Sequence, residues 1–266
     1  TMGDSLTFSA SGDVNDIGIT LSYELDGQGA ATDTFDDHSI SLDFGDLGTL
    51  VFAGHGGSSA LSARDDVTPN AYEEPWDVVT GADADIINGA TAENSWNYTY
   101  NHDSGLLLNL HYVNASDAGV DVSYSDFAVE YTGVEGLRIG YAAGEVEAVT
   151  GTKTEENTLA ATYAMGAITV GVQVSESDSN QANADTESEG VGVSYQVNDD
   201  LTIGYHESAY NAGDKGVDQE STNISISYTM GSMTLAAAFV DEENRGGETT
   251  AVNDISGYAI DLSFAF

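Results

Sequence analysis

Cysteine is absent from this sequence, and proline is nearly so. Without cysteine the chain can form neither disulfides nor thiolate metal sites, and cysteine-based catalysis is excluded as well. The two prolines, Pro69 and Pro75, fall in one segment, whereas 30 glycines are spread along the chain. Because a proline cannot donate a backbone N–H to a sheet, this scarcity indicates long β-ladders that use most backbone N–H groups.

Basic residues are scarce too. Five lysines and arginines stand against 45 aspartates and glutamates, which gives a formal net charge of −40. A chain this acidic repels nucleic acid and is poorly attracted to an anionic lipid surface. Its self-repulsion calls for screening salt or bound divalent cations. Two compatible explanations remain open: acidic surface loops adapted to a salty medium, and selection for the passage of cations.

Long hydrophobic runs are also missing. The longest, such as residues 106–108, fall far short of the roughly 18 apolar residues that a transmembrane helix needs. Yet hydrophobic residues make up 41% of the chain, which excludes a disordered acidic tail. Apolar and polar residues alternate strictly in many segments, of which residues 17–25 and 258–266 are examples. This alternation is typical of strands with two different faces, and we count fifteen such segments.

The connections between these segments are alternately short and long. The short ones are expected at residues 13–16, 45–48, 103–105, 133–136, 165–167, 198–200 and 230–232. The long polar ones are expected at residues 26–37, 54–94, 114–122, 146–156, 176–189, 210–220 and 241–254. A soluble sandwich has no reason to sort its connections by length, whereas a membrane barrel has short turns at one end and long loops at the other.

We therefore predict an all-β fold, a single transmembrane antiparallel up-and-down β-barrel over residues 1–266. Its apolar residues face the lipid, and Ser, Thr, Gly, Asn and charged residues face inward. A closed single-chain bacterial barrel has an even number of strands. We accordingly expect sixteen strands, of which one N-terminal strand is missing before Thr1, and a gap one strand wide between the first and last strands of this chain.

Three segments resemble a known family. Residues 257–266 form a final strand that ends on Phe266, similar to the C-terminal signature of outer-membrane barrels. The hairpin over residues 159–174 and the segment over residues 44–50 are similar to those of general-diffusion porins of the alphaproteobacterial type. The resemblance implies a homotrimer in the outer membrane of a Gram-negative bacterium, passive diffusion of small hydrophilic solutes and ions, and a third outer loop that folds inward.

The connection over residues 54–94 is the longest of all and holds both prolines. Long loops usually have a function, and by its position the resemblance identifies this one as the inward-folded constriction loop. Its charged residues are expected to line the constriction: Arg64, Asp65, Asp66, Glu73, Glu74, Asp77, Asp83 and Asp85. Apolar residues are expected to anchor it: Leu61, Val67, Tyr72, Trp76, Val78, Ile86 and Ile87. The alternative is an exposed outer loop.

Strand parity places further charged side chains on the inner wall: Glu24, Asp43, Glu130, Arg138 and Asp261. Arg138 is the only basic residue within a strand that faces inward. Acidic groups in a narrow, wet channel favour cations. We therefore expect a pore that prefers cations and lacks most of a basic cluster opposite the loop.

Catalysis and cofactors find little support in the sequence. No two histidines have zinc-ligand spacing, and no Ser/His/acid constellation stands out, so we expect no enzyme. Asp83 and Asp85 are candidates for calcium, which prefers carboxylate oxygens, and no other cofactor is expected. The alternative function is a barrel that acts mainly as an adhesin or receptor through acidic outer loops. A soluble calcium-binding β-solenoid is disfavoured because glycine-rich nonapeptide repeats are missing.

Overall fold

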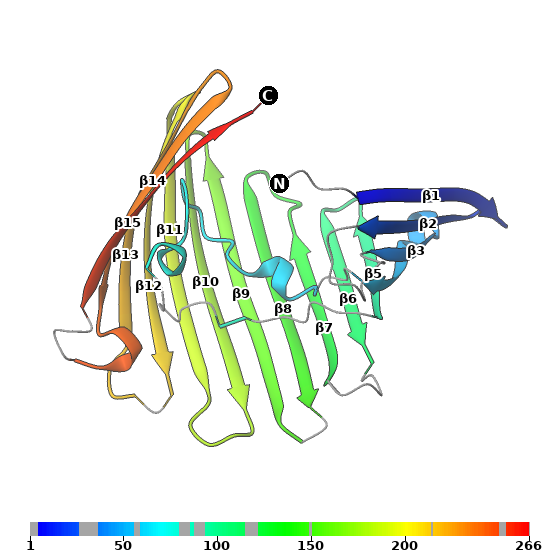
Figure 1. The fold of residues 1–266 in the computed structure, drawn as a ribbon, viewed down its shortest axis with the longest axis horizontal. Helices are drawn as coiled ribbons and strands as arrows, with labels where there is room; N and C mark the ends of the chain where they lie inside the picture. The colour runs from blue at the N-terminus through cyan, green and yellow to red at the C-terminus, as the bar shows by residue number, and fades with distance from the viewer. Residues whose placement is uncertain are drawn as a thin grey trace.

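The computed structural model describes residues 5–26, 37–55, 59–79, 86–87, 94–114, 122–148, 151–213, 215–249 and 254–265. These residues form one antiparallel sheet in which each strand pairs with its neighbours in sequence (Figure 1). The strands are β1 (Ser5–Val14), β2 (Ile17–Asp26), β3 (His38–Asp43), β4 (Thr49–His55), β5 (Ser95–His102), β6 (Leu106–Val113), β7 (Val122–Tyr131), β8 (Leu137–Ala148), β9 (Lys153–Met165), β10 (Ile168–Ser179), β11 (Thr186–Asn198), β12 (Leu201–Ala212), β13 (Gln219–Met230), β14 (Met233–Glu243) and β15 (Ile255–Phe264). The helical turns are η1 (Gly45–Leu47), η2 (Ser62–Arg64), α1 (Pro75–Val78) and η3 (Arg245–Gly247). None of the helices described is long and apolar enough to cross a membrane.

The sheet curls around a hollow, with β1 and β15 as its two edges (Figure 1). Within the described residues β1 pairs only with β2, and β15 only with β14. The fifteen antiparallel strands predicted from the alternation are therefore confirmed. The sixteenth strand remains a prediction.

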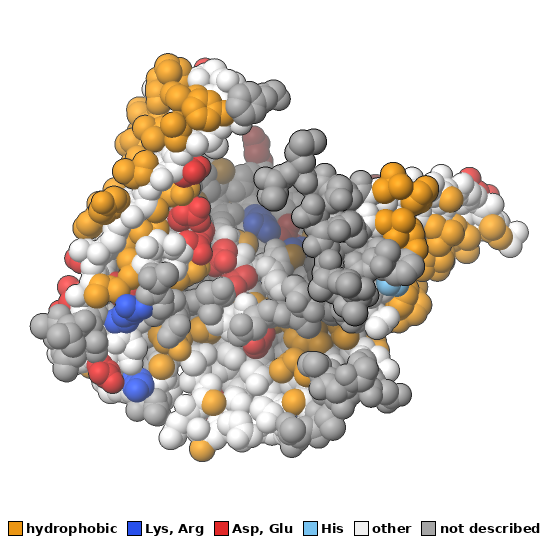
Figure 2. All heavy atoms as spheres, in the orientation of Figure 1, with side chains coloured by type: hydrophobic (Ala, Val, Ile, Leu, Met, Phe, Trp, Pro, Cys, Tyr) orange, Lys and Arg blue, Asp and Glu red, His pale blue; other side chains and the backbone are white. Residues whose placement is uncertain are grey.

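The two faces of the sheet differ as the alternation predicts. Outward-facing Leu159, Val172 and Ile224 are 52%, 49% and 54% exposed. Inward-facing Ala142 and Thr158, by contrast, are fully buried. Figure 2 shows hydrophobic side chains along the outer margin of β13–β15 and acidic side chains gathered in the hollow beside these strands. An apolar exterior with a polar interior is the polarity of a membrane barrel.

The strands reach further than the sequence pattern indicates. The expected long connections at residues 146–156, 176–189 and 210–220 are partly strand, because β8–β13 extend into them from both ends. Ladder pairing persists there, for example between Glu176 of β10 and Glu187 of β11. The apolar–polar alternation ends early because the outward positions become acidic, although the backbone ladder goes on. The remaining connections still alternate between short turns at one end and longer segments at the other.

Candidate pore constriction

Residues 59–79 run along the inner side of the sheet (Figure 1). Their first residues lie against β6, β7 and β8, their middle against β10 and β11, and helix α1 against β13, β14 and β15. Two further residues of the predicted loop, Ile86 and Ile87, are described and packed inside. Asp83 and Asp85 lie outside the described residues.

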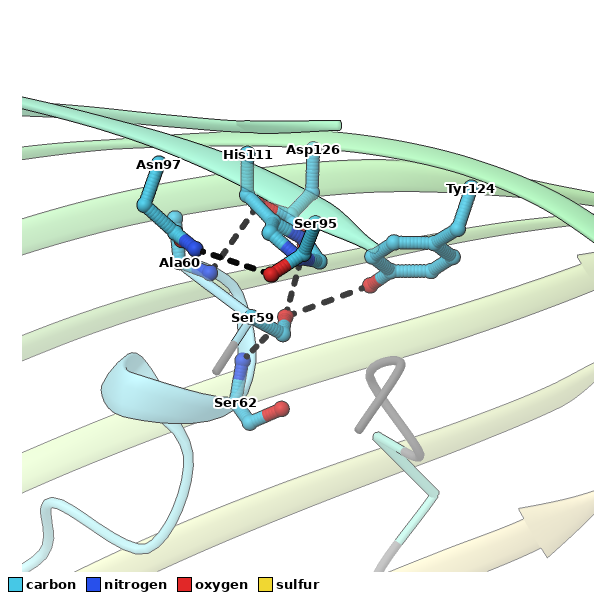
Figure 3. A network of polar contacts seen from close by, with 8 residues as sticks. All are labelled: Ser59, Ala60, Ser62, Ser95, Asn97, His111, Tyr124 and Asp126. Atoms are coloured by element: carbon cyan, nitrogen blue, oxygen red, sulfur yellow. Dashed lines mark hydrogen bonds and ion pairs between the residues drawn. The ribbon is translucent and has the colours of Figure 1, made fainter. Parts of the chain in front are cut away.

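The carboxylate of Asp126 on β7 holds the first residues of this segment (Figure 3). Ser59 Oγ donates to Asp126 Oδ2 at 2.7 Å, and Ala60 N–H donates to Asp126 Oδ1 at 3.0 Å. His111 Nδ1, on β6, lies 3.1 Å from Asp126 Oδ2, and Tyr124 Oη lies 3.4 Å from Ser59 Oγ. These side chains are buried, so that separating the segment from the wall would leave polar groups without partners.

An apolar cluster lies beside this network. Leu61 is fully buried and packs with Ile86 and Ile87 against Ala128 of β7 and Ala142 of β8. The two alanines face inward, and their small size leaves room for the loop to approach the wall. The anchoring role predicted for Leu61, Ile86 and Ile87 is therefore confirmed.

Both arginines expected inside the barrel share one carboxylate. Arg64 Nε lies 3.1 Å from Glu130 Oε2, and Arg138 Nε donates to the same oxygen at 2.8 Å. Arg64 also donates to Asn109 Oδ1 at 3.0 Å and is only 7% exposed. Burial lowers the pKa of Arg64, and the charge of Glu130 opposes that shift. The group of three carries one net positive charge, and the guanidinium of Arg64 lies against the wall.

Inward-facing glycines on the wall leave the space in which the middle of residues 59–79 packs. A Cβ atom added to Gly171 of β10 or to Gly192 of β11 would lie 2.4 or 2.5 Å from atoms of Pro69. On either side, Val67 N–H donates to Gln173 Oε1 at 3.0 Å, and Ala71 N–H donates to Ser225 Oγ at 3.1 Å. The backbone of the loop thus touches the backbone of the wall where side chains are missing.

Helix α1 ends the described part of the segment. Just before it, Asn223 Nδ2 on β13 donates to the carbonyl oxygen of Glu73 at 2.6 Å. The ring of Trp76 meets that of His206 edge-on, with centroids 5.9 Å apart. A Cβ atom on Gly257 of β15 would lie 3.1 Å from Val79. The segment therefore spans the inner side as far as the last strand.

Three of the expected constriction carboxylates come together at this helix. One oxygen each of Glu73, Glu74 and Asp77 lie within 4.8 Å of one another. Burial raises the pKa of Glu74 to about 7, and the nearby charges of Asp66 and Asp77 act in the same direction. The charges of Asp66 and Asp77 oppose the ionisation of Glu74, because like charges at short range disfavour the charged form.

The two remaining acids of the described segment differ in their surroundings. Asp65 accepts a hydrogen bond from Gln173 Nε2 at 2.9 Å and is partly buried. Asp66 is exposed and has a left-handed backbone with φ of 49°. Such a backbone is several-fold more common for Asp and Asn than for most residues.

The wall residues predicted by parity lie in different surroundings. Glu24 lines a cavity of about 400 Å³ between β2–β6 and residues 59–63 of the loop. Asp43 accepts a hydrogen bond from Gly45 N–H at 2.9 Å, and so stabilises a short turn. Burial, then the charges of Glu73 and Asp261, raise the pKa of Tyr72, which places Asp261 near the loop. The lining of the cavity also includes Asp37, which sequence reasoning did not single out, and contains no Lys or Arg.

Sequence reasoning missed the residues that attach the loop to the wall. Asp126, Gln173 and Ser225 are ordinary polar residues at inward positions, and only the three-dimensional path of the loop shows what they bind. The inward glycines were a readable signal, since Gly171 and Gly192 lie directly opposite each other on neighbouring strands. Glycine at two paired inward positions marks a place where another backbone comes close.

Comparison with known proteins agrees with this geometry. The family model described as Gram-negative porin matches residues 1–248. The chain belongs to the Gram-negative porin family. It is therefore a β-barrel protein of the outer membrane in a family of channels, which favours the pore over the adhesin or receptor alternative. No curated protein sequence gives a significant match.

Several solved structures share the fold of this porin at low sequence identity. An anion-selective porin from Comamonas acidovorans has a TM-score of 0.67 and 18% identity, over 98% of this chain and 89% of that chain. The trimer form of OmpT, an outer-membrane protein of Vibrio cholerae, has a TM-score of 0.64 and 16% identity, over 98% of this chain and 91% of that chain. A mutant of the Rh. blastica porin has a TM-score of 0.62 and 13% identity, over 98% of this chain and 89% of that chain.

Proposed function

We propose that this porin forms a water-filled pore for passive diffusion of small hydrophilic solutes, that residues 54–94 constrict it, and that it prefers cations. The observation that carries the preference is the pairing of charges. Arg64 and Arg138 both contact Glu130, whereas Glu73, Glu74 and Asp77 form a group of carboxylates. The loop therefore presents excess negative charge to the lumen.

The wall across from the loop supports the same preference. The cavity bounded by β2–β6 is lined by Glu24 and Asp37 among hydroxyl and amide side chains. A cation in this space would lie beside the carboxylates of Glu24 and Asp37. Low-dielectric walls strengthen the field of such charges and raise the local concentration of cations. The anion selectivity stated for the Comamonas acidovorans porin does not oppose this, because 18% identity carries the fold alone.

The test is the reversal potential of single channels in a planar bilayer under a salt gradient. We expect the sign that corresponds to cation preference at moderate salt. The triple variant E73Q/E74Q/D77N should reduce the preference, because it removes the loop charges without changing side-chain size much. D199N, in the short turn between β11 and β12, is the matched control and should leave it unchanged. Anion preference of the unmodified porin would refute the proposal.

We also propose that the porin is a homotrimer. The support is the trimer form of the similar Vibrio cholerae OmpT. The mass of the unheated protein in mild detergent tests this directly, by light scattering or native mass spectrometry. Three copies per particle are expected, and a monomeric mass would contradict the proposal. Calcium binding at Asp83 and Asp85 stays a prediction, since neither residue is described.

A further inference from the structure

A small cavity lies between the loop and the inner wall of the barrel. Its volume is about 20 Å³, and its lining includes Asp65, Asp66 and Thr68 of the loop and His206 and Ser208 of β12. A particle the size of a water molecule needs about 10–15 Å³ when volume is measured in this way, so the cavity has room for one. Because Asp66 is exposed, the cavity lies close to solvent.

On the β10 side of this cavity the polar side chains have hydrogen-bond partners. Gln173 Nε2 donates to Asp65 Oδ1 at 2.9 Å, and Gln173 Oε1 accepts from Val67 N–H at 3.0 Å. Ser175 Oγ donates to Thr158 Oγ1 at 2.9 Å. Gln173 therefore fixes the direction in which the carboxylate of Asp65 points.

On the β12 side the polar side chains have no such partners. His206 is 1% exposed and Ser208 is 8% exposed. Neither ring nitrogen of His206 nor Oγ of Ser208 has a hydrogen-bond partner among the described residues. A Cβ atom on Gly190 of β11 would lie 3.2 Å from His206 Nε2 and 3.6 Å from Thr68, so this nitrogen lies where β11 and the loop meet. Buried polar groups are almost always paired, and these groups therefore indicate a ligand.

The donor groups indicate which ligand fits. An imidazole nitrogen and a carboxylate that line one cavity are donors that divalent transition metals such as Zn²⁺ and Cu²⁺ prefer, whereas Ca²⁺ and Mg²⁺ prefer oxygen alone. Within the described residues, three ligating side chains lie within 4.8 Å of one another only at Glu73, Glu74 and Asp77. The cavity at His206 thus offers fewer charged ligands, but it is the one that offers nitrogen.

We propose that His206 and Asp65 bind a divalent transition-metal ion, such as Zn²⁺, in this cavity. One imidazole nitrogen of His206 and a carboxylate oxygen of Asp65 are the main ligands, and the hydroxyl group of Ser208 and water complete the coordination. Gln173 acts as a positioning residue, since ligating carboxylates are usually oriented by a further hydrogen bond. The ion joins the loop to β12, and this role does not depend on the ion preference proposed above.

The experiment is electron paramagnetic resonance of Cu²⁺ added to the purified porin in detergent, with excess calcium present. Calcium occupies sites made of carboxylates alone and leaves a site that contains imidazole. We expect a Cu²⁺ signal with hyperfine coupling to nitrogen, which H206Q removes and added Zn²⁺ displaces. D65N should keep the nitrogen coupling and weaken the affinity by about tenfold or more, because loss of even an outer partner of a metal site costs about that much.

Two further variants give the controls. H102Q replaces an exposed histidine at the end of β5 and should leave the signal unchanged. E73Q/E74Q/D77N should also keep it, because the carboxylates at helix α1 supply no nitrogen. If the unmodified porin gives no nitrogen-coupled Cu²⁺ under excess calcium, the proposal is overturned even where a variant fails to fold. A signal that survives H206Q, or that E73Q/E74Q/D77N removes and D65N does not weaken, places the ion elsewhere and overturns it as well.

Discussion

At the scale of single residues, Glu74 is a carboxyl group whose charge changes within the ordinary pH range. Its pKa is raised to about 7 by burial first and then by Asp66 and Asp77. Glu74 is therefore mostly protonated between pH 4.5 and about pH 7, where an ordinary glutamate is mostly ionised. Because its pKa in the folded state lies above that of the unfolded chain, ionisation of Glu74 destabilises the fold, and this penalty is complete above about pH 7.

We predict that cation preference weakens as the pH falls through about 7. The loop loses one negative charge over this range, that of Glu74. Reversal potentials measured from about pH 8 to about pH 6 should show a step in cation preference, and E74Q should remove this step. D199N should show the same step as the unmodified porin. A step of equal size in E74Q would assign the titration to another group.

Asp126 is one of the residues that attach the loop to the wall. Its carboxylate accepts hydrogen bonds from Ser59 and Ala60 and lies against His111. We predict that D126N destabilises the porin by about 1–3 kcal/mol, because the amide nitrogen cannot accept a hydrogen bond from buried Ser59. Thermal unfolding followed by circular dichroism measures the loss, and increased protease cleavage within residues 59–79 would locate it. D199N is again the matched control. An unchanged midpoint in D126N would show that the apolar cluster around Leu61 holds the segment alone.

At the scale of elements, residues 59–79 and the wall fit each other through paired glycines. Gly192 leaves space for Pro69, and a methyl group there would lie 2.5 Å from the carbonyl oxygen of Pro69. That distance is well below a normal contact between these atoms. The loop, which is held at both sides of Pro69, therefore has to move away from the wall and into the lumen.

We predict that G192A lowers the single-channel conductance. A segment displaced into the lumen narrows the pore, whereas the barrel itself keeps its ladder. G12A is the matched control, because a Cβ atom on Gly12 of β1 would meet nothing within 4 Å. Equal conductance of G192A and the unmodified porin would show that Pro69 does not limit the opening.

The strands could be predicted from the sequence because one simple rule, alternation, governs each of them. Prediction failed at the ends of β10 and β11 that are joined by the longer connection. The outward residues there are acidic instead of apolar, so the alternation that predicts a strand is lost. The apolar anchors Leu61, Ile86 and Ile87 were also predictable from their composition. The partners of the loop were not, because the bond between Ser59 and Asp126 depends on how distant strands are brought together.

At the scale of the whole molecule, the net charge of −40 acts on both surfaces of the barrel. Inside, the carboxylates of the loop are the basis of the proposed cation preference. Outside, exposed glutamates lie directly opposite one another at Glu176 and Glu187 and at Glu220 and Glu243. In both arrangements the carboxylates repel one another, and mobile cations can screen this repulsion. Only the inner carboxylates lie on the proposed path of a permeating solute.

We predict that the thermal midpoint of the porin rises with sodium chloride concentration. Screening shortens the Debye length from about 30 Å at 0.01 M to about 3 Å at 1 M salt, and it weakens the repulsion between exposed carboxylates. The variant E176Q/E187Q/E220Q/E243Q removes two directly opposed pairs of exposed glutamates, so its midpoint should be higher at low salt and depend less on salt. Its cation preference should be that of the unmodified porin, because these four glutamates face away from the lumen. Conversely, E73Q/E74Q/D77N should change the preference while it keeps most of the salt dependence of stability. If both variants altered both properties equally, the inner and outer charges would act as a single field, and the division between the two surfaces would be wrong.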